Sequence, residues 1–315
     1  MLRADRAFAL LVLLALVAGA ILLALFATLL PRAEQLLRRG AEDASDLVAI
    51  LLLALATVGI SLGFGSLFHQ LNATLRLIRK LLSHQVPIPR RVLGAARGLG
   101  IADRLDVVDD PRPFSFCYWF IRPRICLSTT LVRRLDAKEL RAVLLHERYH
   151  LLHRDPLRLV IARYFAAGLY VVPVVDDLVG HFALEKELAA DQDAVAALGE
   201  VRPLAAALYK LLPDADDVSL GLLVPVGSLS VTAARIDQLV EGRAVPLTIP
   251  LTSVALSFGA LVAASILVAV DHQRALIGEL APISAVPGLL VAPALLLFLA
   301  AISGGLHQLR LVVHR

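Results

Sequence analysis

Two long stretches without a charged residue lie near the start of this 315-residue sequence. Residues 7–30 and 47–68 are each long enough to cross about 30 Å of hydrocarbon as an α-helix. The first run is longer than the apolar part of a secretory signal and continues into "PRAEQ", so we interpret it as an uncleaved anchor. Because 58% of all residues are hydrophobic, we expect a multi-pass membrane protein.

Two further apolar runs lie near the other end of the chain. Residues 249–270 and 283–302 predict a third and a fourth span, and the two prolines of the last run are tolerable where neighbouring helices satisfy the freed carbonyls. The fold class that we expect is an α-helical multi-pass membrane protein of about four spans. Its domains would be a pair of spans in 1–68, a cytosolic domain in 69–248, and a second pair of spans with a short tail in 249–315.

Lysine and arginine resist translocation and therefore indicate orientation. They gather at both ends of the chain and at the start of the central segment, whereas the loops 31–46 and 271–282 carry little net positive charge. We expect a bacterial inner-membrane protein with both termini and the central domain in the cytoplasm. The formal net charge of +4 then reflects this bias and implies no nucleic-acid partner.

The central segment combines strand and helix signals. Residues 114–129 alternate aromatic and β-branched residues and predict two short strands or a kinked edge strand. Residues 71–85 fit either an amphipathic helix on the inner leaflet or a cytosolic continuation of the second span. The chain's two cysteines, Cys117 and Cys126, are expected to be buried thiols, because a disulfide is unfavourable in the cytosol.

The segment "AVLLHERYHLLHRDP" carries the chemistry. Asp136 and Glu139 have the spacing of a capping box, so a helix should begin there and end near Asp155. His146 and His150 would then lie one turn apart on one face, where both imidazoles can bind one Zn²⁺. Glu147 would be placed to act as general base toward a water molecule on the metal.

A catalytic zinc site needs a third protein ligand. Downstream, "EKELAADQDAV" predicts an acidic helix in which Glu187 could complete the set and Asp191, one turn on, could hold a ligating imidazole. Glu185 competes with Glu187 for the ligand role. The alternative is that all three carboxylates form the solvated face of a helix.

These motifs together resemble the membrane-integrated gluzincin peptidases of the beta-lactam-receptor and antirepressor type, which are related to the HtpX and CAAX prenyl proteases. The resemblance covers about residues 111–198. It implies a mainly α, zincin-like metallopeptidase domain with a short β-sheet, with His146, His150 and Glu187 as zinc ligands and Glu147 as catalytic base. It also implies that Asp191 supports a ligand.

The resemblance further implies that "RPRICLST" is the edge strand that receives substrate. Arg235, in "TAARIDQL", corresponds to an arginine that supports the site in these relatives and is a candidate for oxyanion stabilisation. The extracellular penicillin-binding domain of the receptors has no counterpart here, so beta-lactam sensing is not expected.

The expected function is that of a zinc metalloendopeptidase acting on a protein or peptide at the cytoplasmic membrane face. Cleavage of a cytosolic repressor and quality-control or CAAX-type proteolysis are the competing roles. An intramembrane protease is disfavoured because Arg141, Arg148 and Arg154 surround the histidines. A non-catalytic sensor or scaffold with a structural zinc is disfavoured because such a site has no use for Glu147.

Residues 157–175 are apolar enough to resemble another span, but we predict that they do not cross the bilayer. His150 and Glu187 must reach one zinc ion, and the residues between them are too few to cross and return, at about 20 residues each way. Arg158 and Arg163 would also be costly in hydrocarbon. We expect a helix packed under the zinc site.

Overall fold

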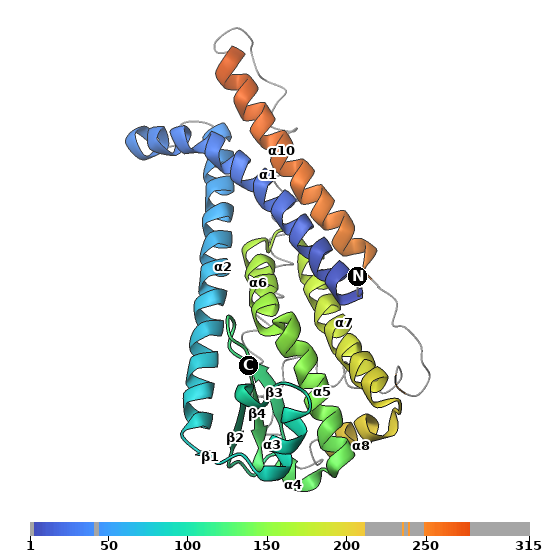
Figure 1. The fold of residues 1–315 in the computed structure, drawn as a ribbon. Helices are drawn as coiled ribbons and strands as arrows, with labels where there is room; N and C mark the ends of the chain where they lie inside the picture. Colours follow the sequence, from blue (N-terminus) through green and yellow to red (C-terminus); the bar gives the residue numbers. More distant parts are fainter. Residues whose placement is uncertain (1–2, 41–43, 212–234, 236–238, 240–248, 278–315) are drawn as a thin grey trace.

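The computed structural model describes residues 3–40, 44–211, 235, 239 and 249–277. Within these residues, three helices are long and apolar enough to cross a membrane: α1 (Arg3–Arg39), α2 (Ala44–Leu82) and α10 (Leu251–Ile277). They correspond to the first three predicted spans and project from one side of the molecule (Figure 1). The fourth predicted span, 283–302, lies outside the described residues.

Helix α2 extends beyond its apolar run without a break. It continues to Leu82, so residues 71–82 prolong the second span and do not form a separate surface helix. Its last turns carry Ile78 and Leu81, which are buried against Val108, Tyr118 and neighbouring residues of the sheet. One continuous helix therefore connects the apolar run to the central domain.

The domain contains a four-stranded sheet. Its strands are β1 (Gln85–Val86), β2 (Leu105–Val108), β3 (Ser115–Tyr118) and β4 (Arg124–Ser128). The order is β1-β2-β4-β3, with β2 and β4 parallel and the other two pairs antiparallel. The prediction of two short strands within residues 114–129 is confirmed, whereas β1 and β2 were not anticipated.

The predicted edge strand was assigned wrongly. The residues "RICLS" form β4, which is hydrogen-bonded to β2 on one side and to β3 on the other. Its backbone groups are therefore already paired within the sheet. The strand with an open side next to the candidate site is β3, which pairs with β4 alone.

Helices cover the sheet and carry the candidate site. The shorter elements are α3 (Arg90–Arg97), η1 (Ala102–Arg104), α4 (Thr129–Arg134) and α8 (Arg202–Leu211). Helix α5 (Ala137–His153) begins at the predicted capping box, in which Asp136 accepts from the Glu139 amide and the Glu139 side chain accepts from the Asp136 amide. Its residues Leu140 and Leu144 are fully buried in the core that contains Ile125 of β4.

Helices α6 (Asp155–Gly168) and α7 (Pro173–Leu198) form a hairpin that turns back at residues 169–172. The tip lies among the spans (Figure 1). There, the Tyr170 hydroxyl donates to the Leu55 carbonyl at 3.4 Å and the Val174 amide donates to Ser257 Oγ at 3.0 Å. Helix α7 then leads the chain back to α5, and the statement that residues 157–175 do not cross the bilayer stays a prediction.

Candidate metal centre

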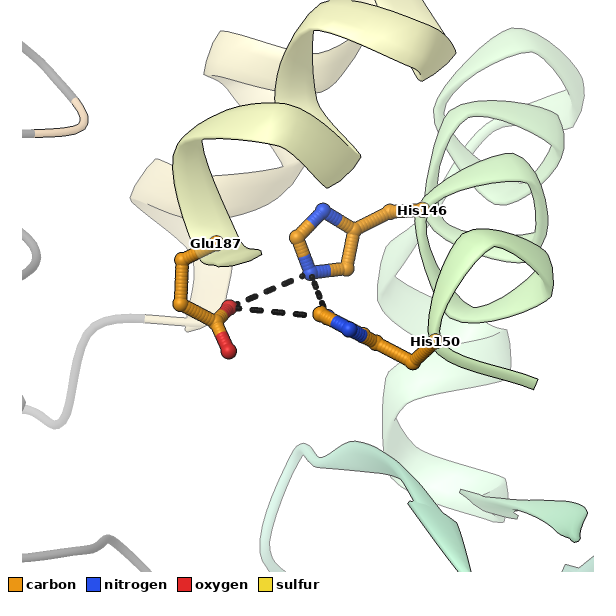
Figure 2. Close-up of side chains that lie close together, drawn as sticks. All are labelled: His146, His150 and Glu187. Carbon is orange, nitrogen blue, oxygen red and sulfur yellow. Dashed lines mark hydrogen bonds and ion pairs between the residues drawn. The ribbon is translucent and has the colours of Figure 1, made fainter. Parts of the chain in front are cut away.

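Three side chains from two helices converge at the centre of the domain. His146 and His150 come from α5 and Glu187 comes from α7 (Figure 2). The two Nε2 atoms are 3.0 Å apart, and Glu187 Oε2 lies 3.4 Å from that of His146 and 3.6 Å from that of His150. Both imidazoles are buried.

The spacing of these atoms fits a tetrahedral metal site. Ligand atoms about 2.0–2.1 Å from a zinc ion in tetrahedral coordination are about 3.3 Å from one another. The three observed separations lie within a few tenths of an ångström of that value. Two imidazoles and one carboxylate are also a donor set that suits Zn²⁺ and leaves a fourth position for water. These residues can therefore hold a metal ion.

Each imidazole is oriented by a carboxylate at its other nitrogen. His146 Nδ1 lies 2.8 Å from Asp191 Oδ1, which is within ion-pair distance, and the supporting role of Asp191 stays a prediction. His150 Nδ1 lies 2.7 Å from Asp155 Oδ2. Such contacts fix the tautomer that leaves Nε2 free to bind a metal. Sequence reasoning missed Asp155, which it treated only as part of the helix stop, although an acidic residue just beyond H-E-x-x-H was visible.

Two cationic side chains, Arg235 and Lys186, contact carboxylates of α7. Arg235 donates from Nε and Nη2 to the two oxygens of Asp191, both at 2.7 Å, and its Nη1 lies 3.6 Å from Glu187 Oε2. Lys186 Nζ donates to Glu187 Oε1 at 2.7 Å. Arg235 therefore lies beside the cluster and makes two hydrogen bonds to Asp191, whereas its role in oxyanion stabilisation stays a prediction.

The surroundings of His150 and Glu187 favour a protonated imidazole and an ionised carboxylate. Burial lowers the pKa of His150, but the Glu187 charge and the contact with Asp155 outweigh burial and raise that pKa to about 9. Burial raises the pKa of Glu187, yet Lys186 and His150 hold it well below its usual range. Without a metal, an ionised Glu187 thus faces a protonated His150.

Glu147 lies between the histidines in sequence but faces the sheet. Ser115 Oγ, from the start of the edge strand β3, donates to Glu147 Oε1 at 2.8 Å. Glu147 is buried, so this is a desolvated contact between the candidate base and the strand beside it. Sequence reasoning did not find Ser115, because nothing local in a strand indicates a partner 32 positions away.

The competing residues lie elsewhere. Glu185 is buried on another face of α7, where His181 Nε2 is 3.8 Å from its Oε1, and it is not part of the cluster with His146 and His150. Cys126 is buried and Cys117 is half-buried, and both are free thiols, as expected. Burial raises the pKa of Cys126 to about 12, which keeps it protonated.

The site lies next to the start of the first span. Ala4 of α1 is buried against Tyr149 of α5 and Ala189 and Ala190 of α7. Arg158, near the beginning of α6, pairs with Asp5 at 2.7 Å. The candidate metal centre is thus close to the N-terminal end of α1.

Comparisons with known proteins agree with this architecture. Residues 41–203, just over half of the chain, match the family described as BlaR1 peptidase M56. Protease HtpX homolog 1 of Streptomyces coelicolor is 33% identical over 90 residues, which are 28% of this chain and 27% of that protein. The chain thus matches about a quarter of the length of this curated relative. With its apolar helices, its H-E-x-x-H helix and a family match over half its length, the chain belongs to the BlaR1 peptidase M56 family.

Proposed function

We propose that this protein is a zinc-dependent endopeptidase whose ligands are His146, His150 and Glu187 and whose general base is Glu147. The observation that carries the proposal is the convergence of the three ligand atoms at tetrahedral spacing, with the buried Glu147 next to His146 in the chain. A purely structural site would not need that carboxylate. Membership of a membrane peptidase family supports the same reaction class.

The residues around the site have separate roles in this mechanism. When bound, zinc would polarise the scissile carbonyl and acidify a water molecule. Glu147 would accept a proton from that water through Oε2 and pass it to the leaving amine, while Ser115 holds Oε1. Asp191 and Asp155 keep the imidazoles oriented, and Arg235 keeps Asp191 in place.

The edge strand β3 supplies a place for the substrate backbone. Its first residue, Ser115, contacts the candidate base, and the side of the strand away from β4 has no neighbouring strand in the described sheet. An extended peptide could add to this edge by main-chain hydrogen bonds. Such pairing would bring a peptide bond next to Glu147, which supports endoproteolysis.

We further propose that the site faces the cytoplasm of a bacterial cell, with both termini on that side of the inner membrane. The distribution of lysine and arginine supports this orientation. The substrate would be a cytosolic repressor in a signalling role, by resemblance to the antirepressor type. The match to an HtpX homolog favours a second candidate, broader proteolysis at the membrane.

The test is metal content and cleavage in purified variants. We expect about one zinc per chain, lost in Glu187→Ala and retained in Glu185→Ala, the matched carboxylate on the same helix. Glu147→Gln should keep its zinc and lose cleavage, and fragments present only with the wild type, identified by N-terminal sequencing, would define the substrate. Cleavage that persists in Glu147→Gln would refute the mechanism.

A further inference from the structure

The turn between β3 and β4 exposes apolar side chains outside the spans. It consists of residues 119–122, with the sequence Trp-Phe-Ile-Arg. Ile121 is 78% exposed and the neighbouring Arg122 is also exposed. Because β4 runs from this turn directly into α4 at the far end of the domain, the turn lies at the opposite end, toward the spans (Figure 1).

Hydrogen bonds to Asp106 of β2 hold the two residues that flank the turn. Buried Asp106 accepts hydrogen bonds from the Tyr118 hydroxyl and, at 2.6 Å, from Arg124 Nε, so the last residue of β3 and the first of β4 are pinned together. Trp119 has a φ of 64°, a region that a bulky side chain adopts only where its surroundings impose it. Ile121 is therefore presented outward by a fixed turn.

The depth of the turn follows from its contact with α2. Tyr118 and Trp119 pack in one cluster with Leu77 and Ile78 of that helix. Leu77 directly follows Arg76, the first charged residue after the uncharged stretch of α2 that begins at Leu47, and long cationic side chains at the end of a span lie at the headgroups. Two residues beyond Trp119 can extend about 7 Å toward the spans. The tip thus reaches the headgroup layer, which adds roughly 5–7 Å to each side of the hydrocarbon.

The side chains around the turn suit that layer. Tryptophan is enriched at the boundary between hydrocarbon and water, where its ring is apolar and its N–H can reach a polar partner. Arg122 in the turn and Arg76, Arg79 and Lys80 on α2 are exposed cations close to this level. Such a cluster attracts anionic phospholipid headgroups.

We propose that residues 119–122 insert Ile121 and the exposed edge of Trp119 into the headgroup boundary of the leaflet beside the peptidase domain. The occupant is the phospholipid of the bilayer that the chain itself spans. This contact would hold the edge strand β3 against the membrane surface. It does not depend on catalysis and can be measured in Glu147→Gln.

Trp119 is the single tryptophan of the chain, so tryptophan emission, excited at a wavelength that tyrosine does not absorb, reports on this turn alone. The experiment uses the full chain in vesicles of phosphatidylcholine and phosphatidylglycerol that contain lipids with a nitroxide quencher. We expect lipid labelled near the headgroup to remove more than half of the emission. Lipid labelled at the end of the acyl chain and aqueous acrylamide should have much weaker effects.

The matched control moves the tryptophan to another exposed position of the domain. Tyr209 is 78% exposed, as Ile121 is, and belongs to α8, the helix that lies at the end of the domain away from the spans (Figure 1). In the double variant Trp119→Phe and Tyr209→Trp, acrylamide should quench the emission and labelled lipid should not. If wild-type Trp119 behaves like this control, or is quenched best from the end of the acyl chain, the proposal is wrong.

Discussion

At the scale of single residues, the carboxylates of Glu187 and Asp155 beside His150 couple metal binding to the release of a proton. The raised pKa of His150, about 9, means that the metal-free site holds a proton on this ring at neutral pH. Zinc needs the neutral imidazole, so each ion bound must displace that proton. The free-energy cost of removing this proton, and with it the loss of zinc affinity, therefore grows as the pH falls below the pKa of His150.

We predict that zinc affinity rises about tenfold between roughly pH 7 and 8 for each proton displaced. Competition with a chromophoric chelator at several pH values would measure it. Asp155→Asn removes the charge that helps to raise the pKa of His150, so its pH dependence should move to lower pH, with an affinity loss of about 10–100-fold. An affinity that does not change over this pH range would contradict the assignment.

Ser115→Ala tests the hydrogen bond to the candidate base. A hydrogen bond to a charged group is worth about 1.5–3 kcal/mol, so we predict a fall in kcat of roughly tenfold or more. Zinc content should stay the same, because Ser115 contacts Glu147 and none of the three ligands. Ser115→Thr keeps the hydroxyl and should retain most of the activity, whereas an unchanged kcat in Ser115→Ala would exclude the role.

How much of the site could be predicted depended on how local each signal was. His146, Glu147 and His150 share one helix, so their spacing alone indicated their geometry. From the residues alone Glu185 competed with Glu187, which only the family resemblance favoured, and in the structure the packing of α7 on α5 brings Glu187 to the histidines. Ser115 and Asp155 could not be assigned because their roles exist only once the strand and the corner after α5 are in place.

At the scale of elements, the prediction was accurate for hydrophobic runs and weak for strand order. The start of α5 followed from its capping box, and the return of the chain after α6 followed from the distance between ligands. By contrast, β1 has two residues and β2 has four, too few for a periodic pattern. Whether β3 or β4 lies at the edge depends on pairing with β2, which no local pattern in residues 114–129 encodes.

The contact between α2 and α6 makes a prediction at this scale. A Cβ added at Gly59 would lie 2.6 Å from the carbonyl oxygen of Gly168, so Gly59→Ala must push two backbones apart. We predict a loss of about 1–3 kcal/mol in the free energy of unfolding. Gly65→Ala, on the same helix with no atom within 4 Å, is the control and should change stability little. Equal midpoints of thermal unfolding for the two variants would show that α2 and α6 can move apart at little cost, which would contradict the prediction.

At the scale of the whole molecule, the proposed orientation can be tested with two cysteines. In a chain with Cys117 and Cys126 replaced, an impermeant thiol reagent applied to intact cells should label Arg38→Cys, an exposed position at the end of α1. Tyr209→Cys, exposed on the peptidase domain, should be labelled only after the cells are permeabilised. The reverse pattern would place the candidate site outside the cytoplasm.

The contacts of the spans with the α6–α7 hairpin determine how this protein can be studied. Residues near its tip bond to Leu55 of α2 and Ser257 of α10, and Phe182 of α7 is buried against α1. Glu187 follows Phe182 on α7 by little more than one helical turn, whereas the two histidines lie on α5. A water-soluble fragment cut free of its spans would therefore lose the support that sets the spacing of its own metal ligands. Assays of this peptidase should be made on the intact chain in a bilayer.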